Sequence, residues 1–512
     1  MLTYARLFAA LCALASTANA VTPLEIKGKD FVNSKTGDRF QILGVEDIRP
    51  YCFLEKAVVL IFVLLRNSYQ PGGSSGFDGK SDPLTDPDAC LRDAALMQRL
   101  GVNTIRIYNL APGLNHDECV SIFNAAGIYM ILDVNSPLYP GYIDRSAPWT
   151  TYTEYYFTQV FGVIESFKDY PNTLAFFAGN EVINEDSVEQ VPQYIRAVQR
   201  DMKEYIAKHL TRSIPVGYSA ADVRPILMDT LNYFMCEDED STTSSSDFFG
   251  LNSYSWCGKS SYTKSGYDVL TEDFRNASLP VFFSEYGCNA VKPRVFTEVE
   301  AIYGEDMTQA FSGGLVYEWT QEANEYGLVQ INSNGTVTLL IDYDNLMTQY
   351  NKLDMSRIAA SNATQTSVKP VTCSASLIQN STFSTNFTLP AKPPGVQDMI
   401  DNGLTNITAG SLVSVKSQTI PTTIYDYNGQ EITDIKLNVL SSDESNTPGS
   451  NPSGSTSSSG NSTSSSSSTS TSTSTTKGTS SGSDHNAGGK LHVPFMGLVT
   501  GAATMLAFFM ML

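Results

Sequence analysis

Short apolar stretches alternate with longer amphipathic stretches from about residue 40 to residue 319. The apolar stretches have the length of buried parallel strands, and the amphipathic stretches have the spacing of helices packed on a sheet. The predicted strands are Phe40–Val45, Asn103–Tyr108, Tyr129–Val134, Leu174–Ala178, Ile214–Tyr218, Phe248–Asn252, Pro280–Ser284 and Gly314–Glu318. Helices are expected between them, as over Asp88–Leu100, Asp117–Ala126, Tyr152–Phe167, Pro192–His209 and Thr308–Phe311. This pattern predicts an α/β fold, a (β/α)8 TIM barrel, with its active site at the carboxyl ends of the strands.

The alternation stops near Met355, so the predicted barrel domain spans residues 21–355. Residues 356–440 mix prolines with short strand-like runs, and they predict a small accessory region packed on the barrel. Residues 441–485 contain 30 Ser or Thr among 45 residues, which is too polar to form a core. We expect this last segment to be a disordered, O-glycosylated stalk.

Both ends of the chain carry apolar segments with the layout of processing signals. Residues 1–20 have an early basic residue, an apolar stretch and a small-residue ending, as in a cleaved secretory signal. Residues 486–512 have small residues, a short polar spacer and an apolar tail with no basic residue after it, as in a GPI-attachment signal. We expect attachment at Asn486 and a cell-surface location on the plasma membrane or in the wall. The alternative is a transmembrane helix, since about 20 apolar residues can cross a bilayer.

The formal net charge is −20, with no basic cluster, which excludes nucleic acid and anionic lipid as favoured partners. The chain also has seven N-glycosylation sequons, which as a set fit a secreted surface protein. They lie at Asn276, Asn334, Asn362, Asn380, Asn386, Asn406 and Asn461.

The cysteine count points to an anomalous segment. Without the signal the chain has seven cysteines, an odd number for an oxidising compartment, and Cys52 is the one out of place. It lies in residues 47–68, which also contain an apolar run too short to cross a bilayer. We expect this segment to come from an unspliced intron or a mistaken gene model. The alternative is a genuine lineage-specific loop, and sequencing of the mature transcript distinguishes the two.

Two glutamates come directly after predicted strands and are candidates for catalysis. Glu181 follows the fourth strand and Glu285 follows the seventh. One such glutamate alone is more often a helix cap or an ion-pair partner, but two at the same end of a barrel favour catalysis. A retaining glycosidase needs a carboxyl pair about 5 to 5.5 Å apart, one acting as acid and base and the other as nucleophile.

The sequence around these glutamates resembles that of the fungal GPI-anchored β-1,3-glucanosyltransferases, family seventy-two of the glycoside hydrolases. The resemblance covers about residues 21–440. Its matching segments are Tyr69–Gly73, Asn103–Tyr108, Leu132–Pro137, Gly179–Val182, Gly250–Cys257, Ser284–Cys288 and Gly313–Glu318. Some family members carry a further cysteine-rich carbohydrate-binding module, and this chain has no cysteine after Cys373.

The resemblance implies a role for each matching residue. It makes Glu181 the acid/base, Glu285 the nucleophile and Asn180 a partner of the donor sugar's 2-hydroxyl. It implies the disulfides Cys90–Cys119, Cys257–Cys288 and Cys236–Cys373. The other binding residues that it implies are Tyr108, Asn135, Ser136, Pro137, Tyr142 and Tyr317 on the donor side. On the acceptor side it implies Asp222 together with an arginine, and Arg224 is the arginine nearest to Asp222 in the sequence. Gln70 and Tyr254 are expected to line the wall of the substrate site, or alternatively to be buried packing residues.

No cofactor or metal is expected. The acidic run Glu237–Asp240 is expected to be a solvated loop, and Asp342–Asn345 lacks the glycine and glutamate of a calcium loop. His116 and His209 alone are too few for a zinc centre or a serine triad.

The expected function is transfer of a β-1,3-glucan segment, cleaved with retention at an internal bond, onto the non-reducing end of another β-1,3-glucan. The partners would therefore be a glucan donor, a glucan acceptor and, through the GPI anchor, the membrane. One alternative is an endo-β-1,3-glucanase that uses the same glutamates. A second is a non-catalytic glucan-binding wall mannoprotein, against which the presence of both glutamates argues.

Overall fold

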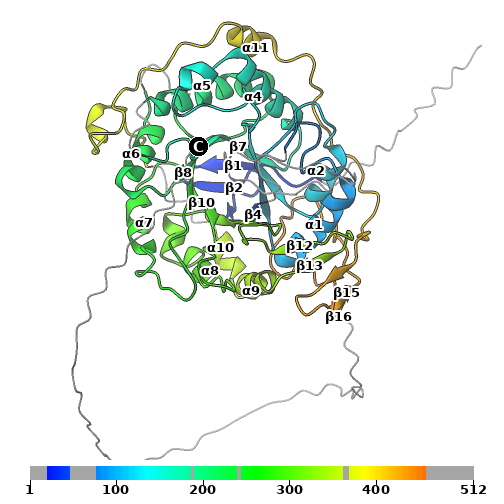
Figure 1. Cartoon of the computed structure of the whole chain (residues 1–512). Helices are drawn as coiled ribbons and strands as arrows, with labels where there is room; N and C mark the ends of the chain where they lie inside the picture. Colours follow the sequence, from blue (N-terminus) through cyan, green and yellow to red (C-terminus); the bar gives the residue numbers. More distant parts are fainter. Residues whose placement is uncertain (1–19, 47–76, 186–189, 239–243, 361–367, 457–512) are drawn as a thin grey trace, which may run out of the picture. The chain divides into compact units, whose positions relative to one another are not determined.

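A closed barrel of eight parallel strands forms the centre of the structure (Figure 1). The strands follow the order β10-β11-β4-β5-β6-β7-β8-β9 around the barrel. Their bounds are Ile42–Glu46 (β4), Thr104–Ile107 (β5), Tyr129–Asp133 (β6), Thr173–Asn180 (β7), Val216–Ala221 (β8), Phe248–Asn252 (β9), Val281–Tyr286 (β10) and Gly313–Val316 (β11). All eight predicted strands overlap these, and the predicted (β/α)8 TIM barrel is confirmed.

The computed structural model describes residues 20–46, 77–185, 190–238, 244–360 and 368–456. Several predictions concern residues outside these ranges. They are the signal at 1–20 except Ala20, the segment 47–68, Gln70, the stalk beyond residue 456 and the attachment signal with Asn486.

Helices cover the outside of the barrel between its strands. Their bounds are Pro87–Leu100 (α1), Asp117–Ala125 (α2), Pro148–Thr151 (α3), Glu154–Phe167 (α4), Val191–His209 (α5), Arg224–Met235 (α6), Tyr267–Phe274 (α7), Glu298–Ile302 (α8) and Ile341–Tyr350 (α9). The sequence of α1 shows why the helix begins and ends where it does. The Asp86 side chain accepts from the N–H groups of Asp88 and Ala89 at its start, and Gly101 ends it with a left-handed φ of 96°. The helix expected over Thr308–Phe311 is wrong in type, because residues Met307–Gln309 form a single 3-10 turn.

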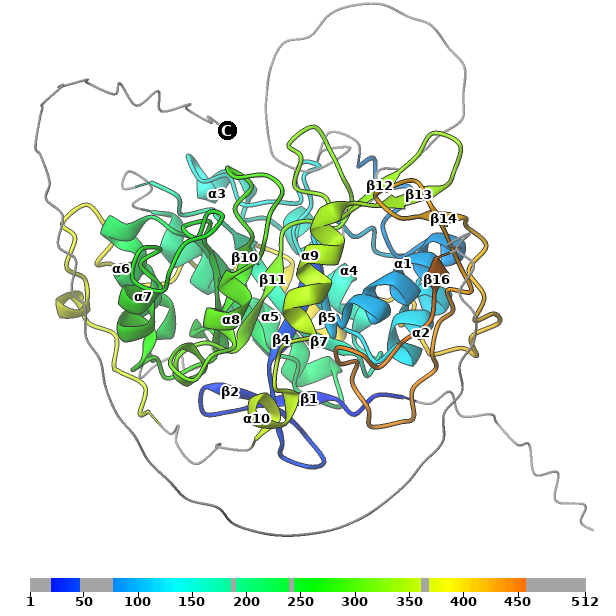
Figure 2. The ribbon, with the colours of Figure 1, turned by 90° about the horizontal axis from the view of Figure 1, so that it is seen from below.

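A small antiparallel sheet closes the amino end of the barrel. Its strands are Leu24–Lys27 (β1), Asp30–Asn33 (β2) and Arg39–Phe40 (β3). Phe31 of β2 is fully buried and its ring contacts those of Phe248 and Phe282 inside the barrel. Figure 2 shows this sheet at the end of the barrel opposite α3. The carboxyl ends of the barrel strands therefore lie away from this sheet.

The accessory region is joined to the barrel domain by a shared sheet. Strands Val329–Ile331 (β12), Val337–Leu339 (β13), Ile424–Tyr425 (β14), Glu431–Thr433 (β15) and Ser455–Thr456 (β16) form one five-stranded sheet in that order. Strand β13 precedes the predicted boundary at residue 355, yet it pairs in parallel with β14. The predicted barrel domain and the predicted accessory region therefore share one sheet, which crosses the predicted boundary at residue 355.

Between these strands, the chain after residue 368 runs over the outer helices (Figure 1). It passes α6, where Asp229 accepts from the N–H groups of Gln379 and Asn380. It contains one short helix, Val396–Asn402 (α11), which packs on α5, and another, Met355–Ala359 (α10), precedes it. At α2 the N–H of Val413 donates to Ser121. The segment is thus held by polar contacts to successive helices.

The predicted start of the stalk at residue 441 is wrong, because residues 441–456 pack on the domain. Asn446 is fully buried, and its amide donates to the backbone oxygens of Gln98 and Val102 at 3.0 and 2.7 Å. Asn451 donates to the Gln98 side chain at 2.8 Å. These buried amides satisfy buried acceptors at the end of α1 and just after it, among them the Val102 oxygen, to which Asn446 donates.

Three disulfides join the cysteines as the family resemblance implies, Cys90–Cys119, Cys236–Cys373 and Cys257–Cys288. The second of them fixes the start of the accessory region to the end of α6. None of the helices in the described ranges is long and apolar enough to cross a membrane.

Replacing Asn446 tests whether residues 441–456 belong to the folded domain. We expect Asn446→Ala to lower the free energy of unfolding by about 1–3 kcal/mol, because it leaves the buried Val102 carbonyl without its donor. Denaturant unfolding measures this change. The exposed Asn428→Ala, in the turn between β14 and β15, is the matched control and should be nearly neutral. Equal stability of the two variants would contradict the assignment.

Candidate active site

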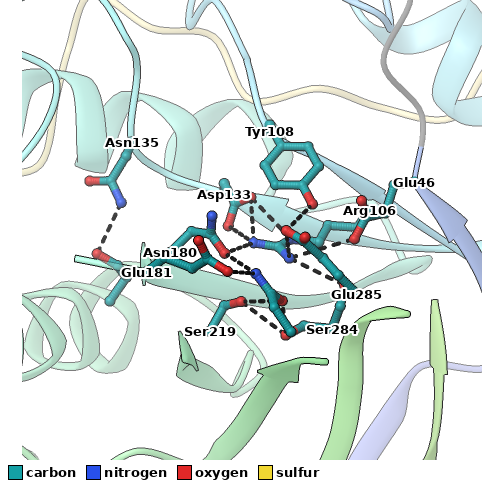
Figure 3. A network of polar contacts seen from close by, with 12 residues as sticks. Glu46, Arg106, Tyr108, Asp133, Asn135, Asn180, Glu181, Ser219, Ser284 and Glu285 are labelled. Carbon is teal, nitrogen blue, oxygen red and sulfur yellow. Dashed lines mark hydrogen bonds and ion pairs between the residues drawn. The ribbon is translucent and has the colours of Figure 1, made fainter. Parts of the chain in front are cut away.

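A buried arginine organises the polar side chains at the carboxyl end of the barrel (Figure 3). Arg106 is fully buried on β5, and it donates to Asp133 at 3.1 Å and to the Asn180 side chain at 3.0 Å. Its Nη1 atom lies 3.6 Å from Glu285 Oε1 and 3.7 Å from Glu46 Oε1. A guanidinium stays charged even here. It therefore links four strand ends through one positive charge.

Glu285, on β10, is held as a carboxylate by three groups. Tyr108 donates to its Oε1 at 2.8 Å and Tyr254 donates to its Oε2 at 2.7 Å. Burial raises the pKa of Glu285, and Arg106 and the two hydroxyls oppose that rise. Both carboxylate oxygens are thus fixed in direction, as a nucleophile requires.

Glu181 has a different environment, directly after β7. The Asn252 amide donates to its Oε1 at 2.9 Å. Burial, with the charge of Glu285 added to it, raises the pKa of Glu181 to about 7. Its φ is 49°, a left-handed conformation that costs on the order of 1 kcal/mol or more for a residue other than glycine. The pairing of β7 with β8 shifts just before it, and such irregularities re-aim side chains near active sites.

Asn252, at the end of β9, connects the surroundings of the two glutamates. Its Nδ2 donates to Glu181 and also to Asn180 at 3.1 Å. Its Oδ1 accepts from Ser219 at 3.1 Å and from Ser284 at 2.7 Å. This full set of hydrogen bonds fixes which way the amide points, so Asn180 and Glu181 each receive a donor.

The predicted donor-side residues lie around this network. Tyr108 and Tyr317 are buried and pack with Tyr254 and Tyr326 into one aromatic cluster. Asn135 donates to the Ala178 backbone oxygen at 3.1 Å, beside the β7 end. Ser136 is buried, while Tyr142 is partly exposed on the loop that contains Pro137. Tyr254 packs in this cluster, and its hydroxyl also donates to Glu285.

The predicted acceptor-side pair stands at the same end of the barrel. Arg224 Nη2 donates to Asp222 Oδ2 at 3.0 Å. The same oxygen accepts from Ser253, the residue after Asn252, at 2.7 Å. Asp222 is therefore held beside the site through β9, and Arg224 is partly exposed next to it.

Sequence reasoning missed Arg106, Asp133, Asn252 and Glu46 as site residues. A signal was present for Arg106, because a charged residue inside an apolar strand, two positions before Tyr108, shares the inward face of that strand. Burial raises the pKa of Asp133 to about 6 against the opposing charge of Arg106. Burial and the charge of Glu285 raise the pKa of Glu46 well above its usual range. Glu46 is thus a second buried acid beside Glu285.

Metal ligation has no visible basis in this part of the chain. Among the residues that the structure describes, no three or more His, Cys, Asp or Glu side chains gather as a metal site. Arg106 instead supplies the positive charge among the carboxylates.

The barrel with glutamates at the ends of its fourth and seventh strands has the arrangement of a retaining carbohydrate-active enzyme. A sequence profile described as "Glucanosyltransferase" matches residues 13–354. The chain is 69% identical over 509 residues to 1,3-beta-glucanosyltransferase gel2 of Aspergillus fumigatus, covering 99% of each chain. It is 42% identical over 399 residues to 1,3-beta-glucanosyltransferase GAS5 of Saccharomyces cerevisiae, covering 78% of this chain and 75% of that one. The chain belongs to the glucanosyltransferase family, glycoside hydrolase family 72.

Solved structures of relatives agree with the observed fold. A mutant of Saccharomyces cerevisiae Gas2p, in complex with laminaritetraose and laminaripentaose, is 35% identical to the chain. The match has a TM-score of 0.59 and covers 73% of this chain and 75% of that chain. A second Gas2 structure, in complex with another compound, matches with a TM-score of 0.62.

Removing one hydroxyl should move the acidic limb of the pH profile. The Tyr254 hydroxyl favours the charged form of Glu285, so Tyr254→Phe raises the pKa of Glu285. A nucleophile must be deprotonated, so activity is lost as pH falls through that pKa, and in the variant it is lost at higher pH. The pH dependence of kcat/KM measures this limb.

Tyr326→Phe is the matched control, because it removes a hydroxyl from a ring packed 5.7 Å from Tyr254 and keeps both hydrogen bonds to Glu285. Its acidic limb should coincide with that of the unchanged protein. An acidic limb that stays in place in Tyr254→Phe, or moves to lower pH, would show that this hydroxyl does not stabilise the carboxylate.

Proposed function

We propose that the protein is a β-1,3-glucanosyltransferase. It cleaves an internal β-1,3-glucan bond with retention and transfers the new reducing end to the non-reducing end of another β-1,3-glucan. One observation carries this proposal. In a member of this family, two glutamates at the ends of the fourth and seventh barrel strands have different partners: Glu181 has its pKa raised to about 7, and Glu285 is bound by Arg106 and two hydroxyls.

The first step uses both glutamates. Glu285 attacks the anomeric carbon of the donor and forms an ester bond to it. The glycosidic bond breaks, and its oxygen takes the proton of Glu181. A pKa of about 7 keeps Glu181 largely protonated in mildly acidic surroundings, so the proton is available.

The second step reverses the role of Glu181. As a carboxylate it takes the proton of an acceptor 3-hydroxyl, whose oxygen then attacks the anomeric carbon. The ester bond to Glu285 breaks and the carboxylate returns to Arg106 and the two tyrosine hydroxyls. Two inversions at one carbon give net retention.

Asn180 and the aromatic cluster are suited to hold the donor sugar. The Asn180 oxygen accepts from Arg106 and Asn252, so its own NH₂ group is directed and can donate to the 2-hydroxyl. That contact strengthens in the transition state of glycoside cleavage. We assign Tyr108, Asn135, Ser136, Pro137, Tyr142 and Tyr317 to the donor side, and Asp222 with Arg224 to the acceptor side.

Amide substitutions of the two glutamates test the proposal. We expect Glu181→Gln and Glu285→Gln each to lower transfer by about a thousandfold or more with the fold retained, since the changes are nearly isosteric. Glu298→Gln, at another buried glutamate with a pKa of about 7 in α8, is the matched control and should keep its activity.

The assay is incubation with a reduced β-1,3-glucan oligosaccharide, followed by measurement of product lengths. Products longer than the starting oligosaccharide indicate transfer, and only shorter products indicate hydrolysis. Full activity of either glutamate variant would contradict the assigned roles.

We further propose that the protein is secreted and held at the cell surface by a GPI anchor at Asn486. The apolar tail after small residues and the sequon-rich chain support this location. A chain ending before Asn486 should appear in the medium, and a GPI-specific phospholipase should release the full protein from membranes. Full protein that resists release and keeps its apolar tail on sequencing would indicate a transmembrane anchor instead.

A further inference from the structure

Exposed aromatic side chains gather in one short stretch of the chain. Of the eleven large apolar side chains exposed in the described ranges, five lie between residues 138 and 155. Three of these, Tyr139, Trp149 and Tyr155, are 72%, 53% and 77% exposed, and we call them the aromatic rim. Exposed apolar side chains mark a binding surface where they form one patch, so the contacts of this stretch decide what it does.

The rim stands on an ordered scaffold. The Ser136 N–H donates to the Gly141 oxygen and the Gly141 N–H donates to the Leu138 oxygen, both at 2.7 Å, which fixes the turn that carries Tyr139. The Asp144 N–H donates to Thr151 at 2.8 Å, across the turn that carries Trp149. These side chains are thus exposed on fixed backbone, which lowers the entropy cost of binding.

One ring contact and several hydrogen bonds of neighbouring residues connect the stretch that carries the rim to the candidate active site. The ring of Tyr139 lies 6.4 Å from the ring of Tyr142, an assigned donor-side residue. Arg145, between Tyr142 and Trp149, donates to Asn184 and, at 3.1 Å, to Glu185, shortly after Glu181. In α4, Tyr156 follows Tyr155 in the chain, and its hydroxyl donates to the Asn135 side chain at 2.8 Å. Figure 2 shows α3, which carries Trp149, at the end of the barrel opposite the sheet of β1, β2 and β3.

The chemistry of the rim favours an uncharged polysaccharide. Aromatic faces offer flat apolar surface, on which the C–H faces of glucose rings can stack. The charged residues Arg145 and Glu185 beside the rim pair with each other, so the rim offers little attraction to an anionic surface. We propose that the aromatic rim extends the donor site and binds the distal part of a β-1,3-glucan chain. This proposal rests on the proposed function and adds a second contact region for long donors.

The tryptophan content gives a selective probe. The chain has three tryptophans, and the other two, Trp256 and Trp319, are 6% and 0% exposed. Acrylamide quenching of tryptophan fluorescence therefore reports mainly on Trp149. The experiment uses the inactive Glu285→Gln protein with laminaritetraose and with a linear β-1,3-glucan several glucose units longer, and calorimetry measures both affinities.

We expect the longer chain to bind more tightly than laminaritetraose and to protect Trp149 from acrylamide. Trp149→Ala in the same background should reduce the affinity ratio of long to short chain by about 5- to 10-fold, the size of one aromatic stacking contact. Its affinity for laminaritetraose reports that the variant is folded. Tyr427→Ala, an exposed aromatic in the turn between β14 and β15, is the matched control and should leave the ratio unchanged.

Three results would overturn the inference. Equal affinities for the two chains with Trp149 still open to acrylamide would leave the proposed function standing without the rim. Absence of any calorimetric binding would refute both. Protection that depends on protein concentration, without glucan, would make the rim a surface for self-association.

Discussion

The buried guanidinium of Arg106 is the interaction on which the site depends. It lies in contact with Asp133, Asn180, Glu285 and Glu46, which come from four different strands. Like charges this close, taken out of water, cannot all remain ionised without a central cation. Arg106 therefore allows the barrel to hold a charged nucleophile, while Glu181, farther along the network, is left with a raised pKa. The division of roles between the two glutamates follows from the groups that contact them, which are Arg106 and two hydroxyls at Glu285 and the Asn252 amide at Glu181.

The barrel supplies the rigidity that this arrangement needs. Its amino end is filled by Phe31 and neighbouring aromatic rings, so the strands cannot shift relative to one another without opening a packed core. Outside, the segment after residue 368 binds the helices in turn and ends in the buried amides of Asn446 and Asn451. The accessory region thus acts as part of the barrel domain.

The barrel fold could be predicted because buried parallel strands are contiguous runs of apolar residues in the sequence. Glu181 and Glu285 stand out for the same reason, as carboxylates at the ends of such runs. The roles of Asp133 and Asn252 were missed, because partners in the barrel interior are set by register between distant strands. Residues 441–456 were missed as structure, because their Ser- and Asn-rich sequence resembles the stalk that follows and only the partners on α1 distinguish them.

Trapping the covalent intermediate tests the central claim most directly. A β-1,3-glucan donor can carry fluorine in place of the 2-hydroxyl of the sugar that is attacked and a good leaving group on its anomeric carbon. It should form the ester and release it slowly, and peptide mass spectrometry locates the sugar. The account predicts the adduct on Glu285, and none in Glu285→Gln. An adduct on another residue, or turnover with inversion at the anomeric carbon, would contradict it.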